Sequence, residues 1–197
     1  MSLEEPSAVQ PGGYQALWYN SAYRTMLGSE VLMRIGESLY LAILPWLLLE
    51  VTGSRSAVGW VMTAIYLPYL LFAVPAGTLV DRFNRQRMMI AVSLLRALLA
   101  VTIPVLAMAG VLAGWYTLLL AFLLSAFGLL FYLGRSSILP QIVPKAEIVT
   151  ANSANVILVG LAMIAGNALV GPVVRLLGLT NALAVYVGTL LLSAVWL

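Results

Sequence analysis

Six long runs of apolar residues, separated by short polar segments, dominate this sequence. They cover about residues 24–49, 57–77, 88–109, 115–134, 151–177 and 180–197. A helix needs roughly 20 apolar residues to cross the hydrocarbon core of a bilayer, and these runs are of that length. A membrane-spanning strand would need only about 10 residues of alternating polarity. The sequence therefore predicts an all-α, polytopic membrane protein with six transmembrane helices, the last of which is still running at Leu197.

The composition excludes a soluble globule and a disordered chain. Of the 197 residues, 62% are hydrophobic and 9% are charged, whereas a soluble domain has about 25% charged residues. Disorder requires the opposite balance of low hydrophobicity and high charge. The net charge of +3 comes from basic residues scattered between the apolar runs. They form no continuous patch that would follow a phosphate backbone, so we expect a lipid bilayer and not a nucleic acid as partner.

The chain contains neither histidine nor cysteine. These residues supply the usual ligands of zinc and haem and the usual bases and nucleophiles of hydrolases. We therefore expect no metal, no cofactor and no enzymatic activity. The only carboxylate pair within an apolar run is Glu30 and Glu37, about 10 Å apart along a helix axis with Arg34 between them.

Basic residues predict the orientation, because cytoplasmic loops are enriched in Lys and Arg. One side of the membrane would hold Arg24, Arg82, Arg85, Arg87, Arg135 and Lys145, and the other only Arg55 and Arg175. The N-terminus is therefore predicted to be cytoplasmic. Residues 1–20 lack the basic start of a signal peptide, so we expect a loose cytoplasmic tail there and a helical bundle over 21–197.

A charged cluster follows the second apolar run, with the pattern Gly77-x-x-x-Asp81-Arg82-x-x-Arg85-x-Arg87. Gly77, with Ala73 one turn earlier, would let the end of the helix pack closely against a neighbour. A plain topology anchor is the simpler interpretation, since basic residues suffice for it. That interpretation leaves Gly77 and Asp81 unexplained.

This cluster resembles the signature loop of the major facilitator superfamily, G-x-x-x-D-R-x-G-R-(K/R)-(K/R), which joins helices two and three. Asn84 stands where the family has Gly, and Gln86 where it has a basic residue. Asn tolerates the positive φ that such a turn can require. Further similarity lies in Thr-Gly-Ser after the first run, Arg-Ser-Ser-Ile-Leu-Pro after the fourth and Thr-Ala-Asn at the start of the fifth. From about residue 20 to 197, the chain resembles the amino-terminal six-helix half of drug and siderophore exporters.

The resemblance implies secondary active transport by alternating access, and specifically proton-coupled efflux of a small drug- or siderophore-like amphipathic molecule through the inner (plasma) membrane. It also implies an inverted three-plus-three repeat of helices. The second and fifth runs are consistent with such a repeat, because both end in a glycine, small apolar residues and then a charge. In the family, the residue matching Asp81 contacts a second six-helix bundle, and the matching arginines form a charge relay.

Only one bundle is encoded here, so we expect the second to come from a longer native chain or from another chain. The alternative is a half-size membrane subunit that does not transport and acts as a scaffold or assembly factor.

Charges inside the first run are the main candidates for a functional site. Glu30, Arg34 and Glu37 are spaced i, i+4 and i+7 and share one face of a helix. A charge in the middle of a bilayer costs about 2.5–3.5 kcal/mol, so these groups must pair or face water. Arg34 can pair with either carboxylate, which would leave the other as a candidate proton carrier, with Glu37 the first choice. The alternative is an ion pair that only fixes helix packing.

Polar groups in the later runs are further candidates. Arg96, in the third run, is expected to snorkel toward the cytoplasmic headgroups. Asn152 and Asn155 begin a stripe of small and polar residues on the fifth run, which would serve either close helix packing or a cavity wall.

Two more candidate groups lie near the ends of runs. Tyr132 and Arg135, at the end of the fourth run, are expected to face the mouth of a transport cavity. Gly171 and Pro172 resemble part of the family's antiporter signature, which is incomplete because Arg175 and Leu176 replace a pair of glycines.

Overall fold

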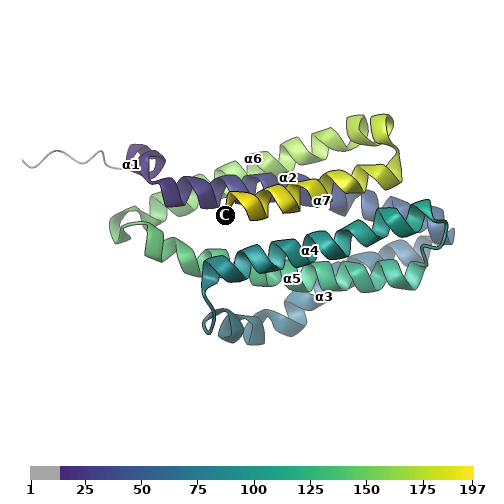
Figure 1. The fold of residues 1–197 in the computed structure, drawn as a ribbon, viewed down its shortest axis with the longest axis horizontal. Helices are drawn as coiled ribbons and strands as arrows, with labels where there is room; N and C mark the ends of the chain where they lie inside the picture. Colours follow the sequence, from purple (N-terminus) through teal and green to yellow (C-terminus); the bar gives the residue numbers. More distant parts are fainter. Residues whose placement is uncertain (1–13) are drawn as a thin grey trace, which may run out of the picture.

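A computed structural model describes residues 14–197, and over that range the chain forms helices joined by short turns (Figure 1). Six helices are long and apolar enough to cross a membrane, which confirms the predicted all-α polytopic bundle. They are Ser21–Thr52 (α2), Arg55–Val80 (α3), Arg85–Met108 (α4), Gly114–Ile142 (α5), Ile148–Leu177 (α6) and Leu179–Trp196 (α7). A short helix, Tyr14–Tyr19 (α1), precedes them, and a 3₁₀ turn, Lys145–Glu147 (η1), joins α5 to α6.

Asparagine side chains begin two of the helices. The side-chain oxygen of Asn20 accepts a hydrogen bond from the backbone N–H of Tyr23 (3.1 Å), and its amide nitrogen donates to the carbonyl of Ile142 (2.5 Å). Asn84 caps α4 in the same way by accepting from the N–H of Arg87 (3.0 Å). Because an N-cap residue is extended, the φ of Asn84 is −64° and not the positive value that we considered for this turn.

The expected tail over residues 1–20 is helical in its last part. Leu17 of α1 is buried in a small apolar cluster with Met26 of α2 and Leu139 of α5, while Trp18 and Tyr19 are exposed. Burial of Leu17 explains why this segment folds against the bundle. Residues 1–13 lie outside the described part of the chain.

The fourth span is longer than predicted, because α5 continues past Gly134 to Ile142. Arg135 and Leu139 lie in this extension and are both buried, so the polar appearance of the segment did not mark a loop. Pro140 falls in the last turn of α5, where it removes one helical hydrogen bond, and the helix ends two residues later at Ile142.

The packing follows two triplets of helices, α2–α4 and α5–α7. The first helix of each triplet packs against the second and third helices of the other: α2 against α6 and α7, and α5 against α3 and α4. The two third helices, α4 and α7, also pack against each other. This reciprocal exchange is the arrangement expected of an inverted three-plus-three repeat.

Small residues allow α6 to approach α2 closely. Asn155 of the predicted stripe is buried, as are Ala162 and Gly166 further along the same helix, whereas Asn152 is exposed. A Cβ atom added to Gly166 would lie 2.7 Å from the carbonyl oxygen of Ile35 and 2.7 Å from the Cβ of Ser38. These distances are shorter than van der Waals contact, so only glycine fits there.

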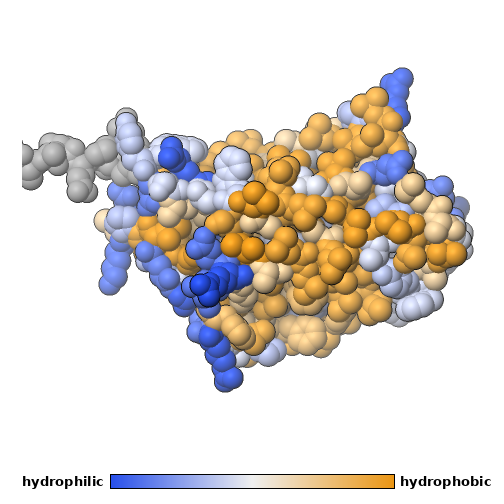
Figure 2. All heavy atoms as spheres, in the orientation of Figure 1, coloured by the Kyte–Doolittle hydropathy of each residue, from blue (hydrophilic) through white to orange (hydrophobic). Residues whose placement is uncertain are grey.

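Two helices of the bundle leave most of their surface uncovered. Only 17% of the apolar span of α3 and 11% of that of α6 are buried, against 44–50% for the other four spans. A Cβ added to Gly77 would meet no atom within 4 Å, so the predicted close packing at this glycine does not occur within residues 14–197. Figure 2 shows that the visible surface is a broad apolar band between more hydrophilic ends, as a membrane-embedded bundle requires.

Replacing Gly166 by alanine should destabilise the bundle, because the added methyl group would push α6 away from α2. Overpacking of this kind costs about 1–3 kcal/mol. Thermal unfolding of the purified protein, followed by tryptophan fluorescence, would measure the loss. Gly160→Ala is the matched control on the same helix, since its added Cβ would meet no atom within 4 Å. Equal midpoints for the two variants would contradict the close approach.

Candidate functional site

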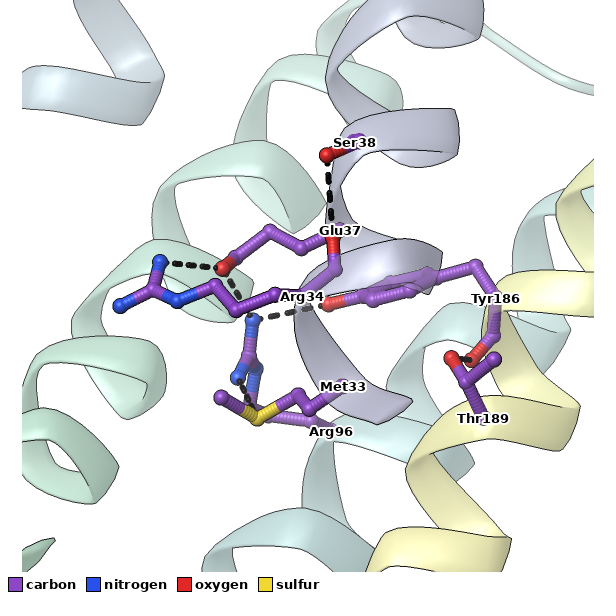
Figure 3. A network of polar contacts seen from close by, with 7 residues as sticks. All are labelled: Met33, Arg34, Glu37, Ser38, Arg96, Tyr186 and Thr189. Carbon is purple, nitrogen blue, oxygen red and sulfur yellow. Dashed lines mark hydrogen bonds and ion pairs between the residues drawn. The ribbon is translucent and has the colours of Figure 1, made fainter. Parts of the chain in front are cut away.

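Glu37 lies at the centre of a charge cluster in the middle of the bundle (Figure 3). One carboxylate oxygen, Oε2, accepts from Arg34 Nη1 at 2.7 Å, and the other, Oε1, accepts from Arg96 Nη2 at 3.0 Å. Arg34 lies one turn before Glu37 on α2, and Arg96 comes from α4. One carboxylate is therefore shared by two guanidinium groups, and both of its oxygens are occupied.

Arg96 is held inside the bundle, which overturns the expectation that it snorkels to the headgroups. Its side chain is only 2% exposed. Besides binding Glu37, its Nη2 donates to the hydroxyl of Tyr186 at 2.9 Å. The absence of a side chain at Gly128 makes room, because a Cβ there would lie 3.3 Å from the guanidinium carbon. Partners within the bundle thus replace the water that snorkelling would provide.

Tyr186 on α7 is a part of this cluster that the sequence did not indicate. Its ring stacks on that of Tyr40 at 4.8 Å between centroids. Stacking holds the ring in place, and Figure 3 shows its hydroxyl directed at Arg96. In the sequence, a single tyrosine in an apolar run looks like any residue of the hydrophobic core. Its role becomes apparent only once α7 is placed beside α2 and α4.

A second charge cluster joins α2, α5 and α6. Glu30 Oε2 forms an ion pair with Arg135 Nε at 2.7 Å. The amide of Asn155, oriented to suit both neighbours, donates to Glu30 Oε2 (2.8 Å) and accepts from Arg135 Nη2 (2.9 Å). All three side chains are buried. Arg135 therefore supports the packing of three helices and does not face the mouth of a cavity as we expected.

These pairs reverse the predicted balance of charge within the spans. Within the interior part of α2, the two carboxylates Glu30 and Glu37 and the single arginine Arg34 leave one carboxylate over. The bundle adds Arg96 and Arg135, so two carboxylates meet three guanidinium groups and each carboxylate has a partner. The predicted excess carboxylate is absent from the described residues in this conformation, and the surplus is one positive charge.

A cavity of about 310 Å³ opens beside the Glu37 cluster. Arg34 and Glu37 line it, together with Tyr69 of α3 and Tyr132 and Gly128 of α5. The side chain of Glu37 remains 14% exposed, whereas that of Glu30 is only 3% exposed. Glu37 and Arg34 are thus the charged groups that border the cavity, and Tyr132 lines it as well.

The loop from Gly77 to Arg87 lies apart from both clusters. Asp81 is 69% exposed, and its carboxylate is 3.6 Å from Arg85 Nη2. Arg82 and Arg87 form no ion pair with any residue between 14 and 197. Gly171 and Pro172 of α6 are exposed as well, so neither belongs to the central cluster. Within the described chain, no three His, Cys, Asp or Glu residues come together in a way that would hold a metal ion.

Removing Arg96 should destabilise the protein strongly, because Glu37 would lose one partner in the membrane interior. Breaking a buried pair from one side costs about 3–5 kcal/mol. We expect Arg96→Gln to lower the thermal unfolding midpoint, and the double variant Glu37→Gln/Arg96→Gln to recover part of the loss. Arg24→Gln, at an exposed position without an ion pair in the described chain, is the control. A midpoint for Arg96→Gln as high as that of Arg24→Gln would refute the pairing.

Comparison with known proteins gives one family. The profile of the Major Facilitator Superfamily matches residues 26–197. The multidrug efflux pump Tap of Mycobacterium tuberculosis is 29% identical over 158 residues, which are 78% of this chain and 38% of the pump. The uncharacterized MFS-type transporter YfiS of Bacillus subtilis is 28% identical over 172 residues (87% and 40%). Macrolide efflux protein A of Streptococcus pyogenes is 27% identical over 132 residues (66% and 32%).

No solved structure matches this chain. The chain spans about two fifths of the length of Tap and of YfiS. The family profile nevertheless covers most of it, from the first turns of α2 to the last residue. With six apolar spans and the signature loop between α3 and α4, this chain belongs to the Major Facilitator Superfamily.

Proposed function

We propose that this chain forms half of a secondary active transporter that exports a small amphipathic molecule by alternating access. The observation that carries the proposal is the Arg34–Glu37–Arg96 cluster, which lies in the membrane interior and borders a cavity. Charged groups at that depth are expensive and usually mark the path of an ion or substrate. The names of two relatives, a multidrug efflux pump and a macrolide efflux protein, support export as the direction.

A second six-helix bundle would complete the transport path. The largely uncovered face of α3 and the exposed surface of α6 before Val170 are the natural contacts for it, as is the open space around Gly77. The exposed carboxylate of Asp81 would reach the same partner from the loop, where Arg82, Arg85 and Arg87 would act with it as a conformational switch. The carboxy-terminal half of a longer chain, or a separate chain, would supply this bundle.

Proton coupling would act through the carboxylates that now bind arginine. A proton on Glu37 would neutralise it and weaken its bonds to Arg34 and Arg96, so protonation would favour a different arrangement of α2 and α4. Glu37 is the first candidate because it borders the cavity, and Glu30 is the second because it is enclosed by Arg135 and Asn155. The transported molecule would meet the aromatic walls at Tyr69 and Tyr132.

Glu37→Gln should abolish export that depends on a pH gradient, because a neutral amide cannot bind and release the proton. The complete transporter would be reconstituted in proteoliposomes, with ethidium and erythromycin as probes. Glu147→Gln in η1 is the matched control, since it removes a carboxylate outside the membrane spans. Undiminished export by Glu37→Gln would exclude Glu37 as the proton carrier. A wild-type complex that assembles but exports neither probe would favour the scaffold alternative.

The orientation can be tested with single cysteines, since the chain has none of its own. The positive-inside pattern predicts that the loop before α4 is cytoplasmic and that the loop after α4 is on the other side of the membrane. Phe83 and Val111 are exposed in these two loops. On intact cells, a membrane-impermeant maleimide should label Val111→Cys, and should label Phe83→Cys only after the membrane is opened. The reverse pattern would invert the proposed topology.

A further inference from the structure

A larger cavity lies at the carboxy-terminal end of α2, away from the Glu37 cluster. It has a volume of about 570 Å³ and lies between α2, α6 and the start of α7. Its lining is mostly apolar, with Trp46 and Leu49 from α2 and Val170 and Val174 from α6. Gly171 also lines it, and a Cβ added there would meet no atom within 4 Å. The space therefore forms an open groove between two helices.

The groove opens on the face of α2 that is turned away from the central cavity. Trp46 follows Glu37 by nine residues, which is about 180° around a helix at 100° per residue. Its side chain is 66% exposed. Because the apolar band of the surface is where the bundle meets lipid, an acyl chain is the natural neighbour of this groove.

Two opposite charges lie at the membrane-end rim of the groove. Glu50 is in the last turn of α2, and Arg175 is in the last turn of α6. Both are exposed, and neither forms an ion pair with the other or with any other residue in the range 14–197. Helix ends lie at the level of the lipid headgroups, so the groove has an apolar body and a rim of mixed charge.

We propose that this groove binds a phospholipid whose headgroup has both a phosphate and a primary ammonium group, as in phosphatidylethanolamine. One acyl chain would lie against Trp46 and Val174. The phosphate would bind Arg175, whose guanidinium suits phosphate oxygens, and the ammonium group would donate to Glu50. A headgroup with phosphate alone leaves Glu50 unpaired beside a negative charge, and a choline headgroup has no N–H to donate.

Native mass spectrometry of the full chain in mild detergent tests this proposal. Equimolar phosphatidylethanolamine, phosphatidylglycerol and phosphatidylcholine with identical acyl chains would be offered together. We expect one phosphatidylethanolamine to be retained in preference to the other two. Gly171→Leu fills the groove and should reduce that retention about tenfold or more. Gly160→Leu, on the same helix with the same free space and outside the groove, should retain the lipid.

The headgroup contacts have their own variants, which leave the helix packing untouched. Glu50→Gln should remove the preference over phosphatidylglycerol, and Arg175→Gln should weaken retention of all three lipids. Arg55→Gln is the matched control, because Arg55 lies at the same end of the membrane and does not line the groove. Brominated-chain phosphatidylethanolamine should quench the fluorescence of Trp46, measured as the difference between wild type and Trp46→Phe.

Three results would overturn the proposal. The first is equal retention of the three headgroups by the wild-type chain. The second is retention by Gly171→Leu equal to that of Gly160→Leu. The third is a lipid preference that Glu50→Gln leaves unchanged. Because these measurements read lipid binding and not export, their outcome does not depend on the transport activity proposed above.

Discussion

The structure depends on one constraint: a charge that enters the membrane interior must find a partner there. Glu37 meets it with Arg34 and Arg96, and Glu30 meets it with Arg135 and Asn155. Removing water from such groups costs several kcal/mol each, so the partners must come from neighbouring helices. The two clusters therefore fix how α2 sits against α4, α5, α6 and α7, and they specify a unique arrangement where apolar packing alone would tolerate several.

The architecture was predictable from the sequence because the length and polarity of a span are local properties. Six spans, most of the turns between them and the Gly77–Arg87 loop followed from runs of residues, whereas the continuation of α5 to Ile142 did not. Pairing across the bundle did not, because it joins residues far apart in the chain. Arg96 was expected at the headgroups, and either Glu30 or Glu37 was expected to have no partner. No residue of α2 indicates that Arg96 or Arg135 lies beside it in the folded bundle.

The surface of the bundle divides into faces with different roles. α4 and α7 pack against each other, and each also contacts the first helix of the opposite triplet, so the third helices bind the two triplets into one body. α3 and α6 each pack mainly against one helix, α5 and α2 respectively, and offer apolar surface at positions related by the inverted repeat. Two largely uncovered helices on such a bundle are what the proposed pairing with a second bundle requires.

The charged groups of α2 have partners that are synthesised later, and this delay affects how α2 inserts into the membrane. Glu37 and Arg96 are 59 residues apart, so at about 5–20 residues per second the ribosome needs about 3–12 s to supply the second after the first. Arg135 and Tyr186 emerge later still. During that interval the interior part of α2 contains the charged residues Glu30, Arg34 and Glu37 and lacks most of the partners that neutralise them. The helix must wait at the insertion machinery, or with its charges near water, until α7 completes the site.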